Sequence, residues 1–448
     1  MTDSPALIFA LVLSGGGARG AYEAGVIDYI RRHMPPEIAR EPLFKIYSGT
    51  SVGAINTAFM AASASDPLYQ GTRLRELWGT LRDQDIYHTD TRALTGFLIR
   101  SGFFMGTNFF GLSELLRKRG GDASTFPFNG VLNTSPFVFY LRRNVAWPQI
   151  HRNIERRVID AVTVSTTHMM SGRLVLFVEK HPEVALRSGG EIPIFTQLSP
   201  KHILASAAIP LIFPIIRINR EFYGDGSMRQ NTPMSPAIHL GANRILVVAV
   251  HKSAAYKYAR PATLPFSEAE PTVGDIVGKL MDSLFLDRLE YDLEQMRRIN
   301  FLLRDLESIY GWNALEHLNE YRTKLAIPGK QVQPIRHIQP FVIAPTEDIG
   351  RVATYHFRRM VAQRDKLTPV QKFFARAAEG SPDAQNDLVS YLMFEPGYLH
   401  ELINLGFEDA RREHDRLVNF FSGRPLEEAR PRAADMAPGP ATPADPGP

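Results

Sequence analysis

A serine flanked by glycines stands where a short apolar run gives way to a helical pattern. The motif is Gly-Thr-Ser-Val-Gly at residues 49–53, in which Gly49 and Gly53 surround Ser51. A serine hydroxyl can act as a nucleophile when a sharp turn holds it at the C-terminal end of a strand, and flanking glycines let the chain approach itself there. The start of the following helix favours negative charge close by. The motif therefore favours attack by Ser51 on a carbonyl carbon, with a glycine-rich turn and an N-capping serine as the alternative.

A second glycine-rich segment, Gly-Gly-Gly-Ala-Arg-Gly at residues 15–20, follows the first apolar run. It satisfies the G-x-G-x-x-G pattern of dinucleotide-binding folds, but the next strand ends in the Ser51 turn instead of an acidic residue that would hold a ribose. It also lacks the Lys-Ser or Lys-Thr of a phosphate-binding loop. We expect an oxyanion hole that faces Ser51, with structural turn glycines and a dinucleotide-dependent enzyme as the alternatives. Its residues would be Gly15, Gly16, Gly17, Ala18 and Arg19, of which Arg19 adds positive charge, with Gly20 as a motif glycine.

A serine nucleophile needs a base, and the candidate is Asp225 in Tyr-Gly-Asp-Gly-Ser at residues 223–227. Asp-Gly pairs such as Asp225 and Gly226 usually form an ordinary turn. Asp225 is nevertheless the candidate base, because the other possible bases stand in less suitable sequence settings. No glycine-rich or strand-end setting marks the downstream histidines His239, His251 and His317. In the mechanism that this arrangement favours, Asp225 takes the proton of Ser51, and water then cleaves the acyl-enzyme.

The three motifs together, in this order and spacing, resemble the patatin-like phospholipase family over about residues 7–250. Two further stretches, 162–173 and 205–213, are also similar. The resemblance implies a three-layer α/β/α fold with a mostly parallel central sheet. It also implies a Ser–Asp dyad without histidine that hydrolyses carboxylic esters of lipids, as a phospholipase A, a lysophospholipase or an esterase does. One departure is Ser227, which stands where the family usually has Gly or Ala.

The function hypothesis has an alternative from a different class. Ser227 and the long region that follows the resemblance motivate a lipid-binding or scaffold protein that keeps the same fold without turnover. In either case the expected partner is a lipid ester, and no cofactor, metal or nucleic acid is expected.

The elements that must position these residues follow from apolar periodicity, which predicts an α/β fold with a parallel sheet covered by helices on both faces. Strand, turn and helix follow one another twice, from residues 7–13 and from 44–47. Later strands are expected at 158–164, 174–179, 215–218 and 244–250, so that the sheet would occupy most of residues 7–250.

The chain of 448 residues is long enough for one large domain or two ordinary ones. An amphipathic helix is expected along 276–303, and further helical patterns cover 350–378 and 384–421. We expect a catalytic domain at 7–251, a linker or loop at 252–273, a mainly helical C-terminal region at 274–422 and a disordered tail at 423–448.

Composition excludes several chemistries. Without cysteine the chain has no disulfide, cysteine-ligated zinc, iron–sulfur cluster or thiol nucleophile. The balance of 51 basic against 47 acidic residues does not indicate nucleic-acid binding. We see no secretory signal and no apolar run near the roughly 20 residues of a membrane span. We therefore expect a cytoplasmic protein, free in solution or peripheral on a membrane.

Two surface features bear on membrane contact. Phenylalanines and glycines alternate with other apolar residues through 96–116, which could form a lid or an interfacial patch, although buried packing is the favoured interpretation. Basic pairs such as Arg142 and Arg143 would favour anionic headgroups if several of them shared one face. The oligomeric state and the headgroup preference stay open.

Overall fold

A computed structural model describes most of the chain. The described residues are 7–88, 130, 132–187, 189–210, 212–251, 289–311, 313–325, 334–363 and 387–424. The possible lid at 96–116, the linker at 252–273 and the tail from 425 onward lie outside them.

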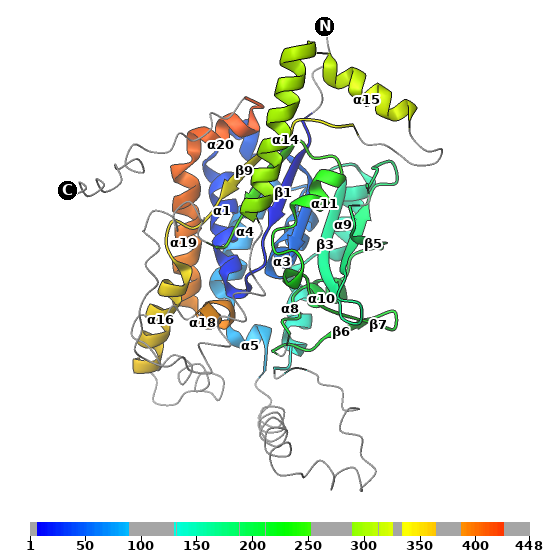
Figure 1. Ribbon diagram of the computed structural model, residues 1–448. Coiled ribbons are helices and arrows are strands. Elements are labelled where there is room, and N and C mark those ends of the chain that lie inside the picture. Colours follow the sequence, from blue (N-terminus) through cyan, green and yellow to red (C-terminus); the bar gives the residue numbers. More distant parts are fainter. Residues whose placement is uncertain are drawn as a thin grey trace, which may run out of the picture.

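The described strands form one sheet at the centre of the molecule (Figure 1). The strand order is β5-β4-β3-β2-β1-β8-β9, with β7 paired to β3 and β6 paired to β7. The strands β3, β2, β1, β8 and β9 run parallel to one another, whereas β4 and β7 run antiparallel to β3. The strands are β1 (Phe9–Leu13), β2 (Phe44–Thr50), β3 (Ala161–His168), β4 (Leu174–Lys180), β5 (Ile192–Phe195), β6 (Ile216–Ile218), β7 (Glu221–Asp225), β8 (Arg244–Val248) and β9 (Gln339–Ile343).

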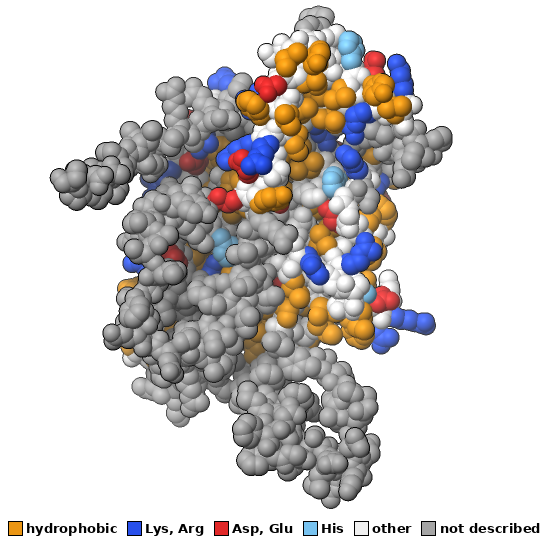
Figure 2. Space-filling model, in the orientation of Figure 1, with side chains coloured by type: hydrophobic (Ala, Val, Ile, Leu, Met, Phe, Trp, Pro, Cys, Tyr) orange, Lys and Arg blue, Asp and Glu red, His pale blue; other side chains and the backbone are white. Residues whose placement is uncertain are grey.

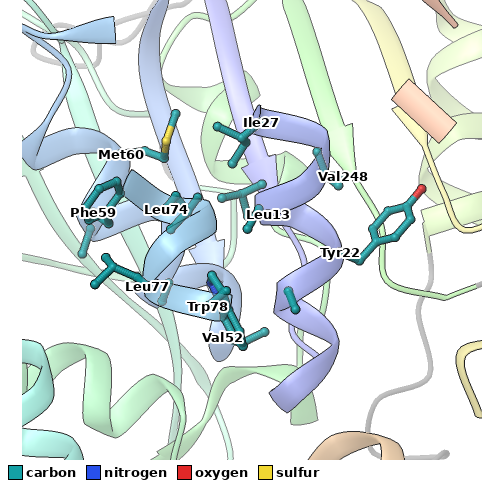
Figure 3. Close-up of a cluster of buried hydrophobic side chains, with 14 of the residues drawn as sticks. Leu13, Tyr22, Ile27, Val52, Phe59, Met60, Leu74, Leu77, Trp78 and Val248 are labelled. Carbon is teal, nitrogen blue, oxygen red and sulfur yellow. The ribbon is translucent and has the colours of Figure 1, made fainter. Parts of the chain in front are cut away.

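Hydrophobic cores lie on both faces of this sheet because side chains alternate along each strand. Leu11 and Leu13 of β1 belong to the larger core, and Ala10 and Val12 belong to the smaller one. Figure 3 shows the larger core, where Leu13 lies among side chains of the covering helices. Its helices include α1 (Gly20–His33), α3 (Val52–Ala62), α4 (Pro67–Thr80), α9 (Trp147–Glu155), α19 (Pro396–Arg412) and α20 (His414–Phe421). The smaller core packs against α11 (Met234–His239) and α14 (Leu289–Tyr310). The predicted three-layer α/β/α fold is confirmed.

The remaining described helices lie around this framework. They are α2 (Pro36–Ala39), α5 (Asp83–Ile86), α8 (Ser135–Asn144), α10 (Pro200–Ser206), α15 (Ala314–Lys324), α16 (Ile349–Gln363) and α18 (Asp387–Leu392), together with the short 3-10 turns η1 (Gly17–Arg19) and η3 (Gly226–Met228). None of the helices that the structure describes is long and apolar enough to cross a membrane.

The sheet extends beyond the range expected from the sequence. The predicted sheet ended near residue 250, but β9 adds a strand from the C-terminal region and pairs in parallel with β8. β9 has only five residues and includes Pro340, so its sequence pattern is too weak for a strand to be predicted. The C-terminal region therefore shares the sheet of the preceding residues.

The predicted C-terminal helices are confirmed in part. Among the described residues of 276–303, α14 buries Leu289, Met296 and Leu303 along one stripe, whereas Ile299 is 52% exposed, contrary to the expected stripe. Figure 2 shows apolar side chains on the outer faces of α14 and α15, where Phe301, Leu302, Ile309, Tyr310, Tyr321 and Leu325 are exposed. The pattern at 384–421 is divided into three helices, because Pro396 starts α19 and the Glu395 side chain caps it.

Helices α1 and α19 pack with their backbones in direct contact. A Cβ on Gly25 would lie 1.9 Å from the carbonyl oxygen of Ile403, and a Cβ on Gly406 would lie 2.1 Å from that of Tyr22. Tyr22 also donates a hydrogen bond to Asp409 at 3.0 Å. This contact ties the C-terminal helices to the first helix of the sheet domain.

Replacing Gly406 by alanine should therefore destabilise the protein. The added methyl group has no space, so overpacking should lower the free energy of unfolding by about 1–3 kcal/mol. The control is Gly79→Ala, whose Cβ would meet only the His400 ring, at 3.2 Å. Urea unfolding measures both variants, and equal stability of the two would contradict the close contact of α1 and α19.

Candidate active site

Ser51 occupies a sharp turn between β2 and α3. Its backbone angles, φ 54° and ψ −123°, lie outside the regions that residues with a Cβ usually adopt. Glycine is needed at Gly53 because a Cβ there would lie 2.2 Å from the carbonyl oxygen of Leu13. The N–H of Ser51 donates to Oγ of Ser206 at 2.8 Å, which holds the turn in place. The strand, turn and helix predicted around Ser51 are confirmed.

Strand β3 brings Ser51 and Asp225 together. Ser165 of β3 pairs with Thr50, the residue before Ser51, and the next residue, Thr166, pairs with Asp225 at the end of β7. The Oγ of Ser51 donates a hydrogen bond to Oδ2 of Asp225 at 2.8 Å. Each of the two residues is only 1% exposed. The structure thus places a serine hydroxyl and a carboxylate in direct contact and away from bulk water.

The environment of Asp225 changes its proton affinity. Burial raises the pKa of Asp225 to about 6, although hydrogen bonds from the Ser227 amide and the Ser51 hydroxyl act in the opposite direction. The Ser227 N–H donates to Oδ1 at 2.8 Å. Gly226 permits this tight turn, because a Cβ there would lie 2.3 Å from the carbonyl oxygen of Ser165. The carboxylate is therefore a stronger base than an exposed one and is still ionised at neutral pH.

The glycine-rich segment lies next to Ser51. A Cβ on Gly15 would approach Cβ of Ser51 to 3.1 Å, and Gly17 lines the same pocket as Ser51. The N–H of Gly15 donates to the carbonyl oxygen of Asn231 at 3.1 Å, so this amide is already engaged. Among the hydrogen bonds of the described residues, none uses the N–H of Gly16 or Gly17. Of the predicted oxyanion donors, Gly15 thus has an engaged amide, Gly16 and Gly17 do not, and Ala18 lies fully buried in η1.

Arg19 is held by residues that are distant in the sequence. Its side chain is 4% exposed, and both Nε and Nη2 donate to Oγ of Ser390, at 2.8 and 2.6 Å. Nη1 lies 3.0 Å from Nδ1 of His251, and the guanidinium lies over the Tyr391 ring at 4.2 Å from its centroid. The guanidinium thus connects the glycine-rich segment to the C-terminal region.

An apolar pocket lies beside Ser51 between α3, α4 and α8. Among the described residues, its lining is almost entirely aliphatic and aromatic, and Asn56 and Asn144 supply its amide side chains. Its remaining members are Gly17, Val52, Ile55, Phe59, Leu74, Leu77, Trp78, Leu81, Ile86, Phe137, Tyr140, Leu141, Val145, Ala207, Ile209, Phe213 and Phe394. Val52, Phe59, Leu74, Leu77 and Trp78 are drawn in Figure 3. Such a lining suits a hydrocarbon chain.

Several of these residues were not singled out from the sequence. Ser206, which holds the Ser51 turn, lies in the stretch 205–213 that resembles the family, but it was not given a role. Asn231 lies six residues after Asp225 and binds the backbone of Gly15. Phe394 reaches the pocket from the C-terminal region, where no local pattern signals it.

The three downstream histidines occupy different parts of the structure. His239 lies near Glu191 with its nitrogen 3.8 Å from the carboxylate, and His317 is on α15, whereas His251 contacts Arg19 beside the glycine-rich segment. The Ser51 hydroxyl donates to Asp225 and not to any of these rings. Within the described ranges, no group of three or more potential ligands could hold a metal ion.

Comparison with known families and structures adds an independent finding. The family model for patatin-like phospholipases matches residues 11–238. Comparison with curated proteins returned no match.

Three solved structures illustrate the structural likeness. VipD from Legionella pneumophila is 13% identical, with 90% of this chain and 67% of that chain covered and a TM-score of 0.29. Human GIVD cytosolic phospholipase A2 in complex with methyl gamma-linolenyl fluorophosphonate is 12% identical (93% and 58% covered, TM-score 0.37). The ExoU–SpcU complex from the type III secretion system of Pseudomonas aeruginosa is 15% identical (94% and 73% covered, TM-score 0.23). The match thus spans less than two thirds of the human chain.

The buried Asp225 carboxyl predicts a pH-dependent stability difference. Burial raises the pKa of the Asp225 carboxyl from 3.8 to about 6 in the folded protein. The contribution of this carboxyl to the free energy of unfolding is therefore complete below about pH 4 and is lost as the pH rises through about 6. Asparagine stays neutral at every pH, so the free energy of unfolding of Asp225→Asn should increase relative to that of the wild type as the pH rises. Urea unfolding should show the difference in free energy growing by about 1 kcal/mol between pH 5 and pH 8.

The control for this measurement is Asp66→Asn, which removes a carboxylate from an exposed helix cap. If the stability difference between Asp225→Asn and the wild type were the same at both pH values, Asp225 could not be a desolvated carboxyl.

Proposed function

Because this chain belongs to the patatin-like phospholipase family, we propose that it hydrolyses carboxylic esters of lipids through Ser51 and Asp225. The observation that carries the proposal is the hydrogen bond of 2.8 Å from Ser51 to Asp225 beside an apolar pocket. Family membership supports a lipid hydrolase activity, and the pair of side chains supplies the chemistry.

In the proposed first half of the reaction, Oγ of Ser51 attacks the carbonyl carbon of the ester while Oδ2 of Asp225 takes the hydroxyl proton. The carbonyl π electrons move to the oxygen, and the amides of Gly16 and Gly17 stabilise the resulting oxyanion, with Ala18 beside them. The tetrahedral intermediate then collapses, the bond to the alcohol breaks, and Asp225 returns the proton to the leaving oxygen. The products are an acyl-enzyme ester on Ser51 and a free alcohol.

In the second half, water repeats the attack on the acyl-enzyme. Asp225 takes a proton from the water, the oxyanion forms again at the same amides, and Ser51 leaves with the proton that Asp225 returns. The fatty acid departs, and the enzyme is restored. The same two side chains therefore serve both halves, and no histidine is needed.

A carboxylate is a weak base for an alcohol, and the site compensates in two ways. Burial raises the pKa of Asp225 to about 6, which increases its affinity for the proton. The proton can also move late, after the attack has made the hydroxyl oxygen more acidic. Exclusion of water from the pair strengthens each of the interactions that stabilise developing charge.

The substrate class follows from the pocket. Its aliphatic and aromatic lining begins at Ser51 itself, so a bound acyl chain would place its ester carbon at the hydroxyl. Each methylene group buried there contributes about 0.8 kcal/mol. We therefore propose acyl esters of lipids as substrates, presented by a lipid surface to which the protein binds peripherally.

Both side chains of the pair should be essential for turnover. Ser51→Ala and Asp225→Asn should each lower kcat for a water-soluble p-nitrophenyl ester, and for phospholipid in mixed micelles, by about 1,000-fold or more, because nucleophile or base is lost. Ser63→Ala removes a hydroxyl that donates to the carbonyl oxygen of Phe59 in the same helix, and it should retain activity. Equal turnover in the wild type and both site variants would disprove the proposal.

Turnover should also depend on pH through the ionisation of Asp225. Since burial raises the pKa of Asp225 to about 6 and the base must be ionised, kcat/KM should be constant above pH 7 and should fall about tenfold per pH unit below about 6. The measurement is a pH profile with a soluble ester, corrected for uncatalysed hydrolysis. A profile that stays level down to pH 5 would exclude Asp225 as the base.

A further inference from the structure

The C-terminal region reaches the active site through one short segment. This segment, the strap, comprises residues 389–394, which complete α18 and continue toward α19. Figure 1 shows α18 beside α5, and two hydrogen bonds fix this arrangement. The N–H of Phe394 donates to Oδ1 of Asp83 at 2.9 Å, and the Tyr87 hydroxyl donates to the carbonyl oxygen of Leu392 at 3.1 Å.

The first end of the strap holds the glycine-rich segment through Ser390. This hydroxyl accepts two hydrogen bonds from Arg19, at 2.8 and 2.6 Å, and Ser390 is fully buried. The carbonyl oxygen of Ser390 accepts a bond from the Tyr398 hydroxyl at 3.1 Å, which ties the strap to α19. Arg19 directly follows Ala18, so a displacement of its side chain would be transmitted to the neighbouring amides.

The strap also touches the glycine-rich segment by its backbone. A Cβ on Gly17, whose φ is +56°, would lie 2.1 Å from the carbonyl oxygen of Tyr391. Gly17 therefore has no freedom to move toward the strap. Together with the bonds to Ser390, this contact limits where the amides of Gly16 and Gly17 can lie.

The other end of the strap contributes to the pocket. Phe394 lines the same pocket as Ser51 and is 6% exposed. Its ring centroid lies 6.4 Å from that of Tyr87, which in turn lies 6.3 Å from that of Phe213, another member of the lining. The size of the side chain at position 394 thus limits the space for an acyl chain.

We propose that the strap is part of the active site, with Ser390 as a positioning residue for the oxyanion donors and Phe394 as a residue that sets the accepted acyl length. This inference rests on the proposed function and extends it to the C-terminal region. It assigns to that region a direct effect on turnover and specificity, beyond its contribution to folding.

The test of Ser390 uses rates expressed per active site, titrated with a fluorophosphonate, so that unfolded protein does not count. With p-nitrophenyl butyrate, Ser390→Ala should lower kcat by about 10-fold to 100-fold and leave KM within about twofold, because the oxyanion forms only in the reaction. Ser390→Thr keeps the acceptor hydroxyl and should recover most of the rate. The control Ser422→Ala removes an exposed hydroxyl of the same C-terminal region.

The test of Phe394 compares two buried phenylalanines. Phe394→Leu should raise the ratio of kcat/KM for the laurate ester to that for the butyrate ester by about threefold, because the pocket is enlarged by about the volume of one methylene group. Phe421→Leu removes the same volume from a ring that is 7% exposed and packs against Phe9 and Phe44, outside the pocket lining. This control should keep the wild-type ratio.

The outcomes separate the inference from the function on which it rests. If the wild type hydrolyses esters while Ser390→Ala matches Ser422→Ala per titrated site and Phe394→Leu keeps the wild-type ratio, the strap is only structural and the inference is wrong. If the wild type neither hydrolyses esters nor takes up the probe, the proposed function fails and the inference fails with it.

Discussion

The hydrogen bond between Ser51 and Asp225 depends on one shared strand. Because β3 pairs with β2 through Ser165 and with β7 through Thr166, the two candidate residues emerge at adjacent positions on the same edge of the sheet. The strained turn at Ser51, the tight turn after Asp225 and the glycines that allow both are needed to close the remaining distance to 2.8 Å. A change in the register of β3 would separate the pair.

Burial makes this pair useful and also makes it costly. Removing water raises the pKa of Asp225 to about 6, so that the carboxylate can accept a proton from an alcohol, and it strengthens the effect of nearby amides on developing charge. The same burial destabilises the ionised carboxylate in the folded protein. The Ser227 amide and the Ser51 hydroxyl offset part of this effect. A serine at position 227 is compatible with this arrangement, since its bond to Asp225 comes from the backbone amide, which any residue there except proline supplies.

The sequence predicted what local patterns can encode. Apolar runs identified β1, β2 and β8, the first two directly before glycine motifs, and the glycines around Ser51 and Asp225 identified these two residues, which the structure brings together. It did not predict that β7 would pair with β3, because residues 221–225 lack alternation, or that β9 would join the sheet. The contact of Arg19 with Ser390 spans 371 positions, and no local pattern carries information over such a separation. Contacts of this kind follow from how α1 packs on α19.

The most direct measurement of the central claim is peptide-mapped labelling by an alkyl fluorophosphonate across a range of pH. The account predicts one covalent adduct, on Ser51, with a labelling rate that rises as the pH increases through about 6 and then becomes constant, because ionised Asp225 must take the hydroxyl proton. An adduct on another residue, no adduct, or a rate on Ser51 that does not change across this range would contradict it.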